Sequence, residues 1–112
     1  MTTRSRKEAL ADYKRQAPSQ GVYAVRCTAS ERVWVGASPN LHAARNREWF
    51  LLRHGDHRDR PLQDAWREYG EDAFAFEVLD TLDEDVAPVL APEVLKEKRR
   101  EWAARLGAAV LL

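Results

Sequence analysis

The sequence has almost no cysteine and no long hydrophobic run. Cys27 is the only cysteine among 112 residues, so the chain cannot form an internal disulfide, and a reducing cytoplasmic setting is expected. No apolar run approaches the roughly 20 residues that a membrane-spanning helix needs. The first 16 residues contain no hydrophobic segment of the kind found in signal peptides. These absences predict a cytoplasmic protein with no membrane partner.

The chain also lacks a net charge, because its 18 basic and 18 acidic residues balance. The charges are nevertheless segregated along the chain. Residues 62–93 carry ten acidic side chains and one basic, whereas residues 41–60 carry five arginines and three acids. A net charge of zero therefore excludes no nucleic-acid partner, since the decisive property is whether basic stretches share a surface. An ordinary solvated surface of mixed charge is the alternative interpretation.

The remaining composition predicts one compact domain over residues 1–112, with 45% hydrophobic and 32% charged residues. Apolar residues alternate in three segments and recur at helical spacing in four others. The strands are expected at 21–27, 32–36 and 73–82, and the helices at 5–16, 41–53, 61–69 and 93–106. This order predicts an α+β fold: a small three-stranded sheet with an N-terminal β-hairpin, flanked by helices. Residues 1–20 are expected to form a helical extension of a core that spans 21–106.

Two short motifs lie on the predicted hairpin. Gly21-Val22-Tyr23 belongs to its first strand and Trp34-Val35-Gly36 to its second. A helix rich in arginine follows, then the stretches LQDAWREYG and FAFEVL, and finally a basic helix with a carboxylate. This order resembles the GIY-YIG nuclease superfamily over residues 21–106. The resemblance implies a metal-dependent endonuclease that cleaves nucleic-acid phosphodiester bonds, with DNA favoured over RNA as the partner.

The resemblance also implies roles for individual residues. Tyr23 matches the tyrosine that activates or orients the attacking water, and Gly36 matches a glycine whose missing Cβ lets backbone and substrate approach. In such nucleases an arginine on the next helix holds the scissile phosphate. In this chain Ala44 occupies the position of that arginine. Arg47 lies one helical turn further on nearly the same face, and we expect it to replace that arginine. Arg45, next to the vacated position, is expected to contact substrate.

A glutamate on a late helix of such nucleases binds one divalent metal, usually Mg²⁺ or Mn²⁺. We assign this role to Glu97, whose basic neighbours favour its ionised form. Glu93 and Glu101, one turn to either side, are the substitutes. A solvated glutamate in a surface ion pair is the alternative for Glu97.

Three further residues are candidates for substrate binding. Trp34 stands where the second motif has a tyrosine, and its indole can stack or donate one hydrogen bond but cannot lose a proton usefully. His54 and His57 flank a polar loop after the arginine helix. They could bind phosphate when charged, assist proton transfer or provide a second metal ligand together with Asp56; solvated loop histidines are the alternative. The other aromatic side chains at helical or strand spacing are expected in the core: Trp49, Phe50, Trp66, Phe74 and Phe76.

Two alternatives to a nuclease stay open. Ala44 and Trp34 depart from the motif pattern, which favours a catalytically impaired module that binds nucleic acid on the same scaffold. The acidic stretch at 62–93 is also compatible with a protein-interaction domain that presents this surface to a basic partner.

Overall fold

A computed structural model describes residues 19–111, which form a mixed α+β fold as the sequence predicts. The helix expected at 5–16 lies outside these residues. The elements, in chain order, are β1 (Gly21–Cys27), β2 (Arg32–Ser38), α2 (Leu41–His54), α3 (Arg60–Tyr69), the 3-10 helix η1 (Glu71–Ala73), β3 (Phe74–Thr81), α4 (Ala91–Leu106) and β4 (Ala109–Val110). None of the helices in the part of the chain that the structure describes is long and apolar enough to cross a membrane.

The sheet has four strands in the order β3-β1-β2-β4, so the prediction of three strands is wrong by one. β1 pairs antiparallel with β2 and with β3, which confirms the hairpin. β4 pairs parallel with Trp34 and Val35 of β2, and the Leu111 N–H donates to the Val35 carbonyl at 2.8 Å. Two residues are too few to show a period of two, so only the tertiary contact identifies this strand.

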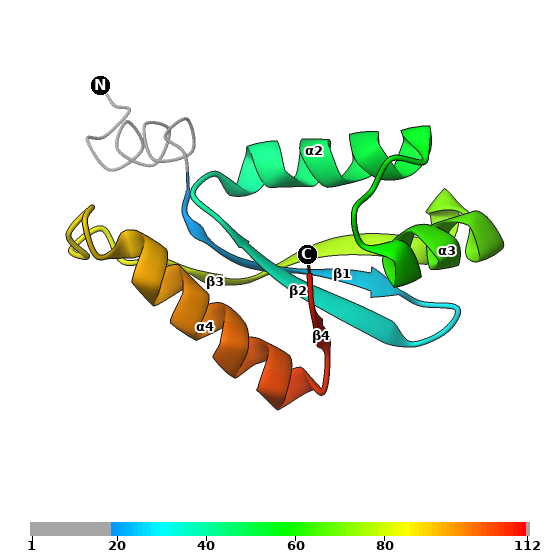
Figure 1. Ribbon diagram of the computed structural model, residues 1–112. Helices are drawn as coiled ribbons and strands as arrows, with labels where there is room; N and C mark the ends of the chain where they lie inside the picture. The colour runs from blue at the N-terminus through cyan, green and yellow to red at the C-terminus, as the bar shows by residue number, and fades with distance from the viewer. Residues whose placement is uncertain (1–18, 112) are drawn as a thin grey trace, which may run out of the picture.

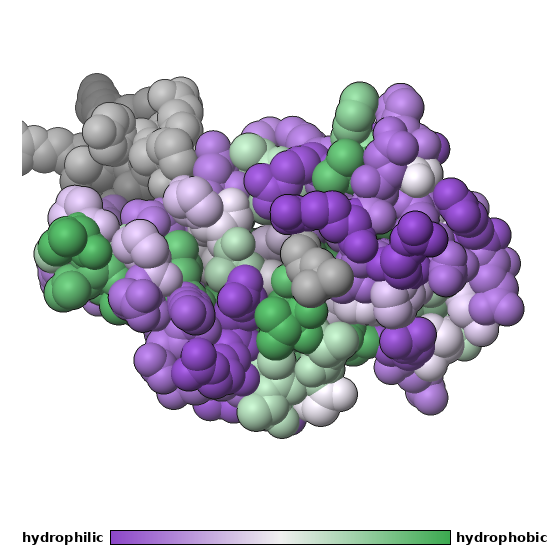
Figure 2. Space-filling view, in the orientation of Figure 1, coloured by the Kyte–Doolittle hydropathy of each residue, from purple (hydrophilic) through white to green (hydrophobic). Residues whose placement is uncertain are grey.

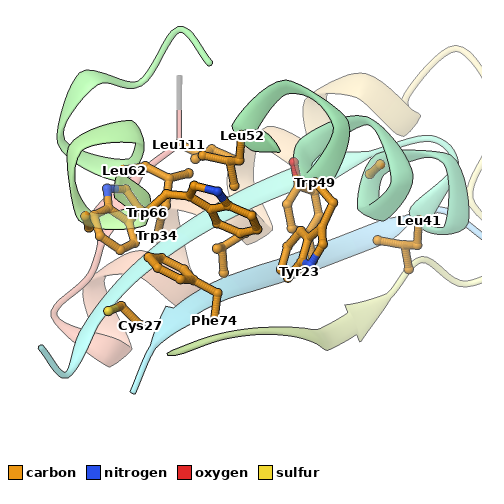
Figure 3. Close-up of a cluster of buried hydrophobic side chains, with 13 residues drawn as sticks. Tyr23, Cys27, Trp34, Leu41, Trp49, Leu52, Leu62, Trp66, Phe74 and Leu111 are labelled. Atoms are coloured by element: carbon orange, nitrogen blue, oxygen red, sulfur yellow. The ribbon is translucent and has the colours of Figure 1, made fainter. Parts of the chain in front are cut away.

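Helices cover both faces of the sheet: α2 and α3 lie on one side and α4 on the other (Figure 1). The alternation along β1 decides which core each side chain joins. Tyr23, Val25 and Cys27 belong to the cluster with α2 and α3, whereas Val22 joins the cluster with α4. Figure 3 shows the larger cluster, to which both Tyr23 and Trp49 belong.

Four of the five aromatic side chains expected in the core pack there. Trp49 meets Trp66 edge-on with ring centroids 5.7 Å apart, Trp66 also packs against Phe74, and Phe76 packs against the cluster from its edge. Phe50 is the exception, since it is 58% exposed. It follows Trp49 directly, so it points about 100° further around the helix, away from the sheet.

Helix caps determine where the polar loop around residues 55–59 begins and ends. Gly55 ends α2 in the left-handed conformation with φ 75°, where its N–H bonds to helix carbonyls. The Asp59 side chain caps α3 by accepting from the Leu62 N–H. At the other end of α2, the Asn40 side chain caps the helix by accepting from the Ala43 N–H. The loop is thus fixed at both ends.

Candidate functional site

A cleft of about 370 Å³ opens beside the paired motifs of β1 and β2. Figure 2 shows hydrophilic surface over α2 and α3 and over α4, with hydrophobic surface between them near the C-terminal strand. The cleft brings together a hydroxyl, three guanidinium groups, two carboxylates and an imidazole. The side chains that carry these groups are Tyr23, Arg47, Arg58, Arg99, Glu48, Asp56 and His57; Gly36, Ala37, Leu51 and Leu111 complete the lining.

Tyr23 and Gly36 face each other across the hairpin as cross-strand partners. A Cβ on Gly36 would lie 2.6 Å from Cζ of Tyr23 and 2.7 Å from its hydroxyl oxygen, well inside van der Waals contact. The missing side chain therefore makes room for the Tyr23 ring, which stacks on Phe76 from the other side. The sequence predicted that the missing Cβ of Gly36 lets substrate approach. In the structure, the Tyr23 ring occupies the space that this missing Cβ leaves.

The Tyr23 hydroxyl is held by a buried carboxylate. It donates to Oε2 of Glu48 at 2.9 Å, and Oε1 of the same carboxylate lies 3.1 Å from Nε2 of His57. All three side chains are almost completely buried, at 2%, 4% and 6% exposure for Tyr23, Glu48 and His57. A tyrosine, a glutamate and a histidine from β1, α2 and the following loop thus form one hydrogen-bonded chain.

The loop fixes the imidazole of His57 from behind. The Asp59 N–H donates to Nδ1 of His57 at 3.0 Å, and the His57 N–H donates to the side-chain oxygen of Gln63. Gln63 is in turn anchored to the Leu52 carbonyl at the end of α2. Because Nδ1 accepts a hydrogen bond, the ring hydrogen resides on Nε2, which donates to Glu48.

This environment raises the pKa of Tyr23 above its ordinary value. Burial is the largest cause, followed by the negative charge of Glu48 and the hydrogen bond to it; Arg47 acts in the opposite direction. The Tyr23 hydroxyl therefore remains protonated at neutral pH. A phenolate is not the resting state of this site.

Three arginines from different elements border the cleft: Arg47 on α2, Arg58 in the loop and Arg99 on α4. α4 covers the opposite face of the sheet, yet Arg99 lines the same cleft as Tyr23. β4 pairs only with Trp34 and Val35, so Gly36 at this end of β2 has no partner on that edge in the described sheet. This open edge is where a side chain from α4 meets the cleft.

Several residues expected at the site lie elsewhere. Trp34 is 1% exposed within the core, so it cannot stack on a substrate, and the prediction of a substrate contact fails for this residue. Arg45 lies over the Trp49 ring at 6.0 Å and does not line the cleft. His54 is on the outer surface of α2, stacked on Phe50. Tyr23, Gly36, Arg47 and His57 are the predicted residues that the structure brings together.

Glu97, the expected metal ligand, also lies outside the cleft. Its side chain is 67% exposed and forms an ion pair of 3.7 Å with Arg100. Mg²⁺ and Mn²⁺ prefer oxygen ligands, but both Glu48 oxygens are engaged, which leaves Asp56 as the remaining carboxylate of the lining. Across residues 19–111, no group of three or more His, Cys, Asp or Glu side chains is placed to hold a metal ion. These residues do not fit a metal site, and the metal requirement stays a prediction.

Sequence reasoning missed three charged residues of the lining: Glu48, Arg58 and Arg99. Glu48 had one available signal, since it lies on the same helical face as Ala44 and Leu52, four residues to either side. A carboxylate in a buried stripe needs a partner. Arg99 had none, because no local pattern reveals which side chain of α4 reaches around the edge of a sheet.

The fold is shared with a nuclease of known structure. The catalytic domain of homing endonuclease I-TevI superposes with a TM-score of 0.70 at 20% identity, covering 83% of this chain and 98% of that domain. A mutant of the catalytic domain of intron endonuclease I-TevI gives 0.67 at 20% identity, covering 80% and 84%. No family model matches the chain, and no curated protein matches it. The fold that the resemblance to GIY-YIG nucleases implied is therefore confirmed.

Proposed function

We propose that this chain is a GIY-YIG-type nuclease that acts on nucleic-acid phosphodiester bonds at the Tyr23 cleft. One observation carries the proposal: a tyrosine hydroxyl and three guanidinium groups border a single cleft, on a fold shared with a homing endonuclease catalytic domain. DNA is the first substrate to test.

The guanidinium groups suit a phosphodiester. An arginine presents paired N–H donors that match two phosphate oxygens, and it stays charged at any working pH. Hydrolysis places additional negative charge on those oxygens in the transition state. Donors already fixed around the phosphate stabilise that charge without reorganising. Arg47 and Arg99 approach the cleft from opposite faces of the sheet, so together they can grip one phosphate from two sides.

Tyr23 supplies an oxygen for the attacking water. Its hydroxyl is fixed by Glu48, and its ring is fixed between Gly36 and Phe76. A water that donates to this oxygen would lie next to a phosphate held by the arginines. No step is assigned to a metal, because the residues of the cleft do not offer a donor set for one.

The test is nicking of a supercoiled plasmid with Mg²⁺, with Mn²⁺ and with a chelator. Wild type is compared with Arg47→Ala, Arg99→Ala and the matched control Arg100→Ala, which removes the same charge from α4 outside the cleft. Loss of a donor to the transition state should reduce the rate by about 10²–10³-fold for the first two variants, and little for the control. A wild type that nicks under none of these conditions would refute the nuclease proposal.

A second function is favoured by one specific observation. An arginine from α4 lies in the cleft while the glutamate predicted to bind metal lies outside it, as expected of a module that binds nucleic acid without cutting. Such a module would bind DNA with strong salt dependence, and removing one phosphate-binding arginine would lower the slope of log K against log salt by about one. Salt-dependent binding without nicking would establish this function, and no affinity even at low salt would favour a protein-interaction domain.

A further inference from the structure

Glu48 is a carboxylate whose side chain is only 5% exposed. Burying an ionised carboxylate is costly unless hydrogen bonds compensate it. Both of its oxygens are satisfied within the protein, by Tyr23 and by His57. Neither partner is a cation that neutralises it, because His57 carries its single ring hydrogen on Nε2. A buried carboxylate with both oxygens engaged thus lies directly behind the tyrosine of the cleft.

The direction of each hydrogen bond follows from the loop. Nδ1 of His57 accepts from the Asp59 N–H, so Nε2 must donate to Glu48. The carboxylate, which has no hydrogen, must also accept from the Tyr23 hydroxyl. The Tyr23 hydrogen therefore points back toward α2, and its oxygen is left as an acceptor for donors in the cleft, of which Arg47 is one. Tyr23 can receive a hydrogen bond there, but it has none to give.

We infer that Glu48, fixed by His57, is a positioning residue that holds the hydroxyl hydrogen of Tyr23 away from the cleft. When Tyr23 accepts a proton from the attacking water, Glu48 accepts the hydroxyl proton of Tyr23. This inference rests on the proposed nuclease function. It adds two residues whose part in the reaction the resemblance did not supply.

The step balances in atoms and charge. As the water oxygen forms its bond to phosphorus, its proton moves to the Tyr23 oxygen and the Tyr23 proton moves to Oε2 of Glu48. The bond from phosphorus to the leaving sugar oxygen breaks, and that oxygen takes a proton from a solvent water. The hydroxide that remains in solvent then takes a proton from Tyr23, and Glu48 returns its proton to Tyr23. Glu48 ends as a carboxylate and Tyr23 as a phenol, as both began.

The surrounding charges support this direction of transfer. Arg47, Arg58 and Arg99 border the cleft with Asp56 as the other carboxylate of its lining, so positive charge faces the phosphate and negative charge lies behind the tyrosine. The raised pKa of Tyr23 is consistent with this direction of proton transfer. A phenol that stays protonated must pass its own proton to an acceptor before it can accept a proton from water.

The first measurement is independent of cleavage. ¹⁵N NMR of the histidine side chains of the full chain at neutral pH should show His57 neutral, with its hydrogen on Nε2. In alkaline titration, Glu48→Gln should lower the pKa of Tyr23, because a negative neighbour is lost. The matched control is Glu68→Gln on α3, which should lower the pKa of Tyr69 instead and leave Tyr23 unchanged. A charged or Nδ1–H form of His57, or a Tyr23 pKa unaffected by Glu48→Gln, overturns the inference.

The second measurement is single-turnover cleavage of a DNA duplex. Glu48→Gln should cut about 10²-fold more slowly or worse, as expected for a lost proton acceptor, while its affinity for DNA stays the same or increases because a negative charge beside Arg47 is removed. Its rate should then rise with pH as solvent hydroxide replaces the relay. Glu68→Gln should cut like wild type. A purely structural role for Glu48 predicts the opposite pattern, with affinity and thermal stability lost together.

The two failures are distinguishable. If wild type cuts and Glu48→Gln cuts equally well, the inference is wrong and the nuclease proposal stands. If wild type does not cut, the nuclease proposal fails and the transfer step falls with it, and the NMR measurements then decide whether Glu48 positions Tyr23. If Glu48→Gln does not fold, the wild-type ¹⁵N measurement of His57 decides by itself.

Discussion

Replacing Gly36 by alanine tests how tightly the Tyr23 ring is held. The new Cβ would lie 2.6 Å from Cζ and 2.7 Å from the hydroxyl oxygen, so the ring must move. Behind it, Phe76 stacks at 4.9 Å and Glu48 binds the hydroxyl at 2.9 Å, which leaves no free direction without loss of a contact. The substitution should therefore disturb both packing and the buried hydrogen bond.

The expected cost follows from these two losses. Overpacking a core by one carbon costs about 1–3 kcal/mol, and leaving a buried polar group unsatisfied costs about 1–3 kcal/mol more. The sum, about 2–6 kcal/mol, is a large share of the roughly 5–15 kcal/mol that stabilises a domain. Part of it is offset, because alanine restricts the unfolded chain relative to glycine and stabilises by about 0.4–1 kcal/mol.

A double-mutant cycle in urea isolates the contact from everything else. Gly36→Ala is measured in wild type, in Tyr23→Phe and in Tyr23→Leu. The cost should largely persist with phenylalanine, which keeps the clashing ring carbon, and should fall to zero or become slightly stabilising with leucine, which lacks it. An equal cost in all three backgrounds would refute the reasoning, because the penalty would then have nothing to do with Tyr23.

The remaining predictions concern ion pairs outside the cleft. Asp80 accepts from Trp102 and pairs with Lys98, and these contacts lower its pKa below 3.8; its contribution to stability is therefore present above that pH and lost as the pH falls through the lowered pKa. Asp80→Asn should destabilise the fold by about 1 kcal/mol at pH 7, and urea titrations of wild type and variant should converge as the pH falls below the lowered pKa of Asp80. The exposed ion pair of Arg53 and Glu71 should contribute little to stability, although its atoms are only 2.6 Å apart, because water screens it. Arg53→Ala should therefore leave the urea midpoint unchanged within error. A clear decrease in the midpoint would contradict this.

Local patterns sufficed for most of the fold. Alternation located the hairpin and β3, and helical spacing located α2, α3 and α4 with ends displaced by one or two residues. These signals work because each element has one face in the core, and burial imposes its period on the sequence. The paired motifs also placed Tyr23 opposite Gly36, since a hairpin's register is a short-range property.

Contacts between distant segments leave no local pattern in the sequence. The two-residue strand β4 exists only because the chain after α4 returns to β2. The metal ligand predicted on α4 depended on which face of that helix meets the cleft, and the structure turns Arg99 toward the cleft and leaves Glu97 in solvent. Helical periodicity gives the faces of a helix, but not which of several polar residues points past the edge of a sheet.

The sequence by itself determined the scaffold, the hairpin motifs and the presence of arginine near Tyr23, because each of these is encoded within a few residues of chain. Only the tertiary structure decided the chemistry behind Tyr23. Glu48 and His57 lie 25 and 34 positions further along the chain, and their burial beside its hydroxyl depends on how α2 and the loop after it pack on the sheet. A charge changes its function when it is buried, and burial is a property of the packed chain.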